Sequence, residues 1–297
     1  VPLFTLANAR TEGARPKLDW AGALALIGTV VPLLLSLPVR SAQSLPTQGS
    51  DALEFLRGPA IVMAVVMLVV FLYVERRAEE PMIPLSVFGK RDFAAAIGAS
   101  FIAGGGLYAA GVFVPLFLQN VLHKSATEAG LALAPMTLTL VAGSVLGGNL
   151  VTRTGSFRIL GFSGLAVAGA AMFALSTLTE ATLPRTIMLE LAVLGFGLGV
   201  TMPTLSLASQ NAVEHKNLGV ATSMSQFSRS LGGSLGVAAF GAMLAQRVAQ
   251  GLTPALATVF AVAAALFLVA AVVALLLRDL PLRKPSPPEA LTVEQQP

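Results

Sequence analysis

The chain of 297 residues is 55% hydrophobic and only 11% charged, with a mean hydropathy of +0.79. Soluble domains carry about 25% charged residues, so this composition excludes an ordinary soluble protein and indicates a membrane protein. The net charge of +4 is spread in short basic clusters between apolar runs, which argues against nucleic acid as a partner. Cysteine is absent from the sequence, which excludes disulfide bonds and thiolate metal sites.

Eight apolar segments are long enough to cross a bilayer, whose hydrocarbon core needs about 20 mostly apolar residues per helix. We predict helices because open strands cannot satisfy their backbone groups in lipid. The expected fold class is therefore an all-α integral membrane protein. The predicted spans are residues 18–38, 58–74, 93–119, 126–150, 158–179, 186–208, 218–245 and 254–277.

The spans divide into a group of two and a group of six. Residues 17–75 hold two helices, residues 76–92 form a charged cytoplasmic junction on the membrane surface, and residues 93–279 hold six helices. Residues 1–16 are expected to be the end of a truncated helix followed by a cytoplasmic loop. Residues 280–297 are rich in proline and polar side chains, so we expect a disordered cytoplasmic tail.

Lysines and arginines predict the orientation, because cytoplasmic loops carry an excess of them. Most of the 19 basic residues lie on the side that holds both chain ends and the loop around Arg153. The opposite side holds Arg40, Arg57, Lys124, Arg185 and Arg247. We therefore expect a multi-pass protein of the inner cell membrane, with both ends of the fragment in the cytoplasm.

A lone arginine, Arg229, lies within the apolar residues 217–244. Helical periodicity gives this segment a small or polar side and an apolar side, which is expected to face lipid. The first side holds Thr222, Ser225, Gln226, Arg229, Gly232, Gly233 and Gly236, and the second holds Met224, Phe227, Leu231, Leu235 and Ala238. Gly232 and Gly236 predict close helix packing.

An arginine inside a membrane costs at least about 2.5 kcal/mol, so Arg229 needs a partner or water. It either lines a wet cavity, where it binds substrate or steers coupling, or has a structural role. In the structural alternative, its long side chain reaches the cytoplasmic interface or bonds the carbonyl groups of a neighbouring helix.

Two other predicted spans carry candidate functional residues. One face of 93–119 holds Phe101, Tyr108 and Gln119, which predicts either a cavity wall for a large, partly apolar compound or an ordinary packed helix. Glu190 is the only acid well inside an apolar run. It is a candidate for proton exchange if it is buried, or else a residue of the outer membrane interface.

No motif in the sequence predicts catalysis. The segment GFGLG at 195–199 resembles part of a dinucleotide fingerprint, but it lies in an apolar span without a preceding strand. Nucleotide-binding loops, paired metal-binding histidines and nucleophile triads are also missing from the pattern. We therefore expect neither an enzyme nor a cofactor.

The loop after the fourth span reads GNLVTRTGSFRIL, residues 148–160. It resembles the G-x-L-a-D-R-x-G-r-r-x-x-l loop of the major facilitator superfamily, with Gly148, Arg153, Gly155 and Arg158 at matching places. The resemblance implies that these four residues form a gating loop. Thr152 stands where the family usually has an acid, which weakens the case for a gating salt bridge in this loop.

Three further stretches resemble the fourteen-span drug:proton antiporters of the EmrB/QacA type. They are RPKLDWAGALALIG, VERRAEEPMIPLSVFGKRDF and FSRSLGGSLGVAAFGAML, which match the two-helix insert, the junction after it and the penultimate helix. The resemblance implies a C-terminal six-helix half, built as a 3 + 3 inverted repeat and preceded by two insert helices. Its N-terminal partner half would lie outside this fragment.

The resemblance further implies multidrug efflux, in which a proton is exchanged for an amphipathic compound by alternating access. The expected partners are a small-molecule substrate, protons, membrane lipid and the N-terminal half. The substrate-binding candidates are Arg229, Gln226, Tyr108, Phe101 and Gln119. Two alternatives stay open: a dedicated exporter of an endogenous metabolite or antibiotic, and a membrane scaffold, sensor or truncated remnant without transport.

Overall fold

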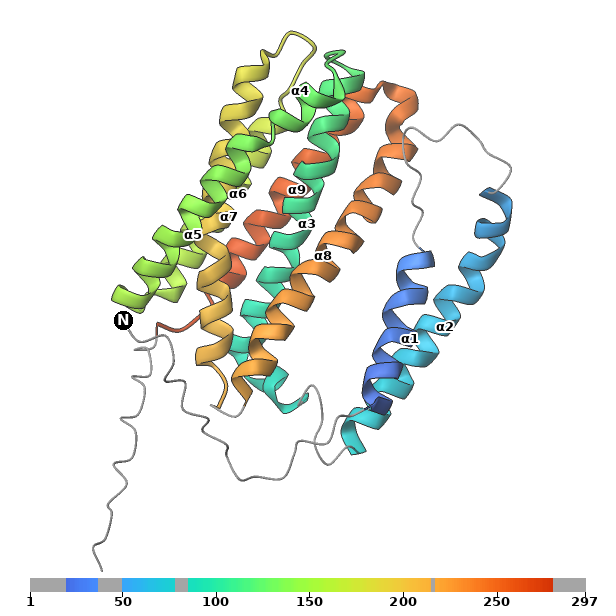
Figure 1. The fold of residues 1–297 in the computed structure, drawn as a ribbon, viewed down its shortest axis with the longest axis vertical. Helices are drawn as coiled ribbons and strands as arrows, with labels where there is room; N and C mark the ends of the chain where they lie inside the picture. Colours follow the sequence, from blue (N-terminus) through green and yellow to red (C-terminus); the bar gives the residue numbers. More distant parts are fainter. Residues whose placement is uncertain (1–19, 37–49, 78–84, 215–216, 280–297) are drawn as a thin grey trace, which may run out of the picture.

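The structure is a computed structural model that describes residues 20–36, 50–77, 85–214 and 217–279 (Figure 1). The expected truncated helix and loop at 1–16 and the expected tail at 280–297 lie outside these residues, as does part of the 76–92 junction. Within the described ranges the chain forms helices and no strand, which confirms the all-α fold class.

Each of the eight predicted spans contains a helix in its described residues, although the fourth is divided after Leu131. Pro135 lies in the first turn that follows, where its missing N–H is tolerated because it would have no helical partner. The helices are α1 (Trp20–Ser36), α2 (Ser50–Arg77), α3 (Arg91–Asn120), α4 (Ala126–Leu131), α5 (Ala134–Thr154), α6 (Phe157–Leu175), α7 (Pro184–Asn211), α8 (Leu218–Arg247) and α9 (Leu252–Ala274). Short 3₁₀ helices, η1 (Leu85–Gly89) and η3 (Val248–Gln250), precede α3 and α9.

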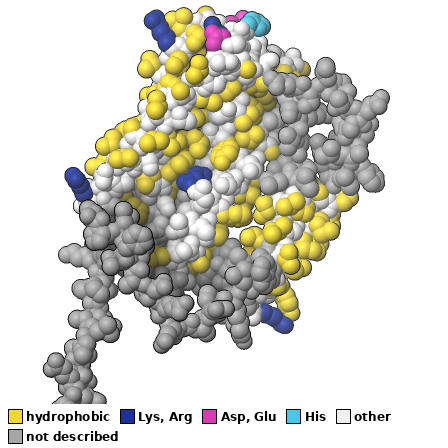
Figure 2. Space-filling model, viewed as in Figure 1, with side chains coloured by type: hydrophobic (Ala, Val, Ile, Leu, Met, Phe, Trp, Pro, Cys, Tyr) yellow, Lys and Arg dark blue, Asp and Glu magenta, His cyan; other side chains and the backbone are white. Residues whose placement is uncertain are grey.

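Six of the helical segments described are long and apolar enough to cross a membrane. They are Gly58–Arg77 in α2, then α3, α4 with α5, α6, α7 and α9. Helix α1, with 17 residues described, is shorter. Helix α8 has 30 residues but is not among the six, because its serines, Gln226 and Arg229 make it more polar. Figure 2 shows hydrophobic side chains over the middle of the molecule and basic ones mainly at its ends.

The six helices α3 and α5–α9 form one bundle, beside which α1 and α2 form a hairpin (Figure 1). In the bundle, α3 packs against α8 and α9, whereas α7 packs against α5 and α6. Let α3, α5 and α6 exchange places, in that order, with α7, α8 and α9. The two sets of packed pairs then replace each other, and the α6–α9 and α3–α7 pairs are unchanged. The packing therefore follows the 3 + 3 repeat that the family resemblance implies.

Glycines bring α8 and α3 into backbone contact. A Cβ atom added to Gly236 would lie 2.8 Å from the Cα atom of Gly105, and one added to Gly232 would meet the carbonyl group of Phe101. Ser228 also donates a hydrogen bond of 2.9 Å from Oγ to the carbonyl oxygen of Ile97. This geometry confirms that the Gly232 and Gly236 pair sets close helix packing.

The symmetry-related pair, α5 and α7, packs in the same way. A Cβ atom added to Gly147 would lie 2.7 Å from the Cα atom of Val200, and one added to Gly143 would lie 2.6 Å from the carbonyl oxygen of Phe196. Gly195 of the GFGLG segment packs against α5. Gly197 packs against Gly164 of α6 and Gly199 against Leu140 of α5, so all three glycines of that segment lie at helix contacts.

The core of the bundle is built from alanines and large apolar side chains, including the fully buried Phe157, Phe260 and Phe267. A second, smaller cluster contains Ala25 and Phe71 of the hairpin together with residues of α3 and α8. The bundle thus has its own core, and the hairpin shares a separate apolar contact region near one end of it.

Candidate functional site

Helix α8 has a polar exposed surface, unlike its neighbours. It exposes no large hydrophobic side chain, whereas α1–α3, α5–α7 and α9 each expose several. Leu138 of α5 and Leu268 of α9, for example, are 70% and 55% exposed. The exposed side of α8 instead carries Thr222, Ser223, Gln226, Ser230 and Ser234.

The prediction that the apolar side of α8 faces lipid is wrong. Met224 is buried and Phe227 is half-buried, and both belong to the apolar cluster near the hairpin. Large apolar side chains fill the interior here, while Ser228 and Gly232 allow close approach to α3. On the predicted polar side, Thr222 and Gln226 are exposed, but the glycines Gly232 and Gly233 are buried against α3. Polarity alone does not show which side of a helix a bundle leaves uncovered.

A pocket of about 610 Å³ lies between α7 and α8. Its lining contains one cation, hydroxyl and amide groups, and no carboxylate. The lining residues are Ser206, Gly219, Thr222, Ser223, Ser225, Gln226 and Arg229. Ser206, Gly219 and Ser223 were not among the candidates predicted from the sequence. The polar residues Ser206, Ser209 and Gln210 at the end of α7 were the available signal.

Hydrogen bonds and backbone contacts hold the Arg229 region in place. The Arg229 guanidinium donates from Nη2 to Oε1 of Gln226, one helical turn away. The carbonyl group of Arg229 lies against Gly104 of α3, so the helix backbone cannot shift freely. On the α7 side, the hydroxyl groups of Ser209 and Ser225 share a hydrogen bond of 2.8 Å.

The predicted substrate-binding residues are brought together only in part. Arg229 and Gln226 both line the pocket. Tyr108 lies close by, because its ring packs against Gly233 and its phenol lies within electrostatic reach of Arg229. The side chain of Phe101 is exposed about two turns before Tyr108 on α3. Gln119 is roughly 16 Å beyond Tyr108 along the same helix, so it is not a pocket residue.

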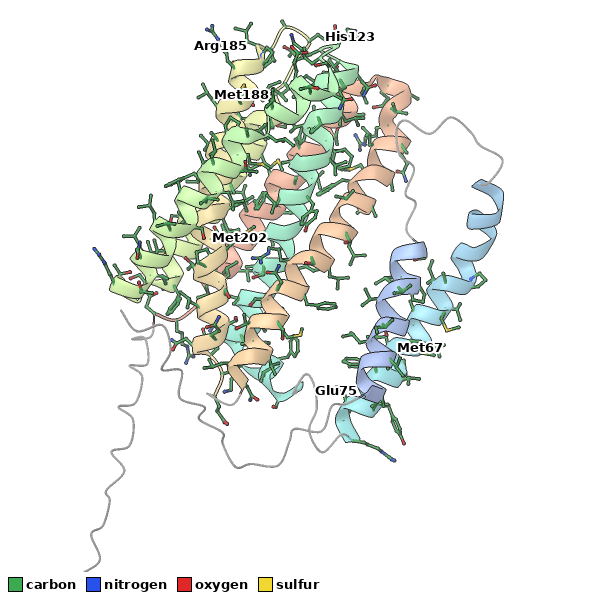
Figure 3. All side chains as sticks on the ribbon, viewed as in Figure 1. Met67, Glu75, His123, Arg185, Met188 and Met202 are labelled. Atoms are coloured by element: carbon green, nitrogen blue, oxygen red, sulfur yellow. The ribbon has the colours of Figure 1, made fainter. Side chains whose placement is uncertain are left out.

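Glu190 lies in the second turn of α7, roughly 24 Å along the helix from Ser206 of the pocket. Its Oε2 atom is buried, and no described residue hydrogen-bonds to it. Arg185, at the start of α7, is exposed and points away from the bundle (Figure 3). Glu190 is therefore a partly enclosed carboxyl group, separate from the Arg229 pocket.

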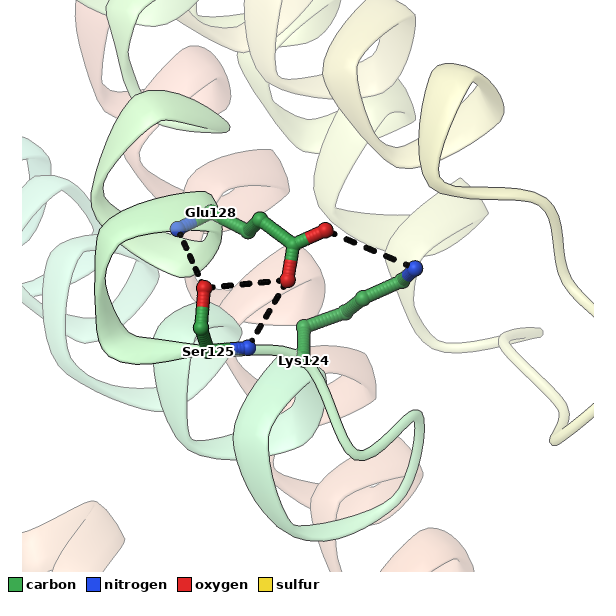
Figure 4. A network of polar contacts seen from close by, with 3 residues as sticks. All are labelled: Lys124, Ser125 and Glu128. Atoms are coloured by element: carbon green, nitrogen blue, oxygen red, sulfur yellow. Dashed lines mark hydrogen bonds and ion pairs between the residues drawn. The ribbon is translucent and has the colours of Figure 1, made fainter.

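Glu128 of α4 differs from Glu190 because its carboxylate has hydrogen-bond partners. Its Oε2 accepts a hydrogen bond of 2.9 Å from the Ser125 backbone N–H, and its own N–H donates to Ser125 Oγ at 3.2 Å (Figure 4). Lys124 Nζ lies 3.7 Å from Oε1. This closed capping box satisfies the carboxylate and begins α4, so Glu128 has a structural role.

The expected gating loop joins α5 to α6. Gly155 ends α5 with a φ of 66°, a left-handed conformation that favours glycine. Thr152 donates to the carbonyl groups of Gly148 and Asn149 on its own helix, so it does not replace the missing acid as a partner for another helix. The side chains of Arg153 and Arg158 are exposed.

Two aspartates connect helix ends beside this loop. Asp279, after α9, accepts a hydrogen bond of 3.0 Å from the backbone N–H of Arg158 in the first turn of α6. Asp92, in the first turn of α3, accepts one of 3.0 Å from the backbone N–H of Arg278. The ends of α3, α6 and α9 are thereby joined without an arginine side chain.

The sequence also matches known proteins. The family model of the Major Facilitator Superfamily matches residues 20–237 and again residues 99–296. The chain is 36% identical over 230 residues to Multidrug resistance protein 3 of Bacillus subtilis, covering 77% of this chain and 44% of that protein. It is 33% identical to the Tetracycline resistance determinant of Streptomyces rimosus, covering 75% and 62%.

A third relative, the Tetracenomycin C resistance and export protein of Streptomyces glaucescens, is 31% identical over 83% of this chain and 44% of its own length. The chain thus spans less than half the length of two of these three relatives. The family model covers nearly all of the described helices. The chain therefore belongs to the major facilitator superfamily of all-α membrane proteins.

Proposed function

We propose that this chain is the C-terminal portion of a fourteen-span exporter of the EmrB/QacA type. It consists of two insert helices followed by the six-helix half. The exporter exchanges protons for amphipathic organic compounds by alternating access. The names of the relatives, which refer to multidrug and antibiotic resistance, support efflux as the direction of transport.

The exposed polar side of α8 carries this proposal. In lipid, a helix surface of serine, glutamine and arginine leaves polar groups without water, and the arginine alone costs at least about 2.5 kcal/mol. A water-filled cavity between two halves of a transporter removes that cost. The proposal therefore places the α8 surface and its pocket against an N-terminal half, with lipid on α5, α6 and α9.

Within this cavity, Arg229 and Gln226 bind the polar part of a substrate, and Tyr108 and Phe101 contact its apolar part. Glu190 is the proposed proton-exchanging group in this half, because its carboxyl group is partly enclosed and lacks a described partner. The end of the bundle that holds Arg153 faces the cytoplasm, as the distribution of basic residues predicts.

A second candidate keeps the fold and changes the cargo to one compound made by the producing cell. Its support is the relative named as a resistance and export protein for tetracenomycin C. A narrow substrate range, with no transport of unrelated dyes, would favour this candidate over multidrug efflux.

The test is transport by the complete gene product in everted membrane vesicles, with rhodamine 123 and fluorescein as probes. We expect energised vesicles to accumulate at least one of the two dyes, and a protonophore to abolish that accumulation. Arg185→Ala is the matched control for Arg229→Ala, because Arg185 is exposed at a helix end. Accumulation that survives the protonophore would contradict proton-driven antiport.

A further inference from the structure

The charge of the α7–α8 pocket points to the class of compound that it binds. We infer that this pocket binds an anionic group, such as a carboxylate, sulfonate or phenolate, on an amphipathic substrate. This inference rests on the proposed function and specifies its substrate. Arg229 is the single charged residue of the lining, and the lining holds no carboxylate that could bind a cationic drug.

Arg229 has hydrogen-bond donors to spare. A guanidinium group carries five N–H donors and accepts none. Its side chain donates to Oε1 of Gln226, and no carboxylate among the described residues forms an ion pair with it. The planar arrangement of the remaining donors suits a carboxylate or sulfonate, which can accept two parallel hydrogen bonds.

Gln226 and Ser206 offer further hydrogen-bond donors to the pocket, because the side-chain oxygen of each already accepts a hydrogen bond. Because the Gln226 oxygen accepts from Arg229, its amide nitrogen is left to donate to a ligand. Ser206 Oγ accepts a hydrogen bond from Gln210, which leaves its own O–H available. Three donor groups therefore meet in the pocket, from Arg229, Gln226 and Ser206.

The hydroxyl groups of Thr222 and Ser223 contribute neutral oxygen acceptors to the lining, and no charge. Each donates its proton to a carbonyl group of its own helix, at 2.9 Å and 3.0 Å. Because their oxygens are uncharged, recognition of an anion depends on the donors of Arg229, Gln226 and Ser206. A cationic ligand would meet an uncompensated guanidinium group instead, so the pocket selects against quaternary amines.

The experiment uses two reagents that differ in charge and share one reaction. The chain contains no cysteine, so Ser223→Cys places a single thiol in the pocket once any cysteine elsewhere in the complete protein is replaced. Its rate of modification is measured with the anionic sulfonatoethyl and the cationic trimethylammonioethyl methanethiosulfonate. Thr177→Cys, exposed beyond the end of α6, is the matched control position.

We expect Ser223→Cys to prefer the anionic reagent. Arg229→Gln should lower the anionic-to-cationic rate ratio by about fourfold at low salt, the effect of one charge roughly 10 Å from the thiol in a water-filled cavity. Arg229→Lys keeps the charge and should keep the preference, which separates electrostatics from a structural role. The ratio at Thr177→Cys should be unaffected by either substitution.

Two results would overturn the inference, and the second of them would also overturn the proposed function. If Ser223→Cys reacts with both reagents and Arg229→Gln leaves the ratio unchanged, the pocket is open but not selective for anions, and the proposed function stands. If Ser223→Cys reacts with neither reagent while Thr177→Cys reacts, the α8 surface is not water-filled, and the proposed function fails as well.

Discussion

Replacing Gly236 with alanine should loosen the contact between α8 and α3. The added Cβ atom would lie 2.8 Å from the Cα atom of Gly105, whereas carbon atoms pack best at about 3.5–4.0 Å. The two backbones must therefore separate by roughly 0.7 Å or more. A gap of 0.5–1 Å already removes a quarter to a half of the dispersion energy of each contact.

The expected change in the stability of Gly236→Ala follows from two opposing effects. Overpacking costs about 1–3 kcal/mol, while alanine gains about 1 kcal/mol over glycine in helix propensity. Gly241→Ala on the same helix gains the propensity alone, because nothing lies within 4 Å of its added Cβ atom. The two variants should therefore differ by about 1–3 kcal/mol, with Gly241→Ala the more stable.

The assay is thermal unfolding of the detergent-purified protein, followed by the loss of the monodisperse peak in size-exclusion chromatography. We expect Gly236→Ala to unfold roughly 2–6 °C below Gly241→Ala. Gly147→Ala in α5 should behave like Gly236→Ala, since it occupies the symmetry-related contact. Equal midpoints for Gly236→Ala and Gly241→Ala would refute the close-packing argument.

Three further predictions concern single side chains. Arg229→Ala should lower transport at least about tenfold, because a charge-assisted hydrogen bond contributes about 1.5–3 kcal/mol, while Arg185→Ala should match the wild type in the same vesicle assay. Asp279→Ala should lower unfolding stability by about 1 kcal/mol, whereas Asp279→Asn keeps the accepting oxygen and most of the stability. Glu190→Gln should abolish the dependence of dye transport on the proton gradient; transport that remains fully gradient-driven would remove Glu190 from coupling.

The positions of the helices could be predicted from sequence because the bilayer permits few alternatives. Long apolar runs must be helical in lipid, and the described residues of each predicted span contain a helix. The division after Leu131 was not predicted, since the run from Ala126 to Thr154 stays apolar through the break. The Gly232 and Gly236 contact was predicted because small residues one turn apart allow the backbones of two membrane helices to approach closely.

The candidate site was predictable only where it is local to one helix. Arg229 and Gln226 lie one turn apart on α8, so periodicity alone placed them together. Ser206 reaches the pocket from α7, and that pairing depends on how two helices pack. Gln119 shares a helix face with Tyr108 but lies about three turns away. Periodicity shows which residues share a face, and it does not show how far apart they lie along the helix.

Accessibility to water tests the central claim that α8 lines a cavity. In the complete protein in native membranes, Ser230→Cys on the exposed side of α8 is compared with Leu268→Cys on the exposed side of α9, using a water-soluble maleimide. We predict that the thiol on α8 is labelled and that the thiol on α9 is protected by lipid. Labelling of Leu268→Cys together with protection of Ser230→Cys would contradict the proposed arrangement.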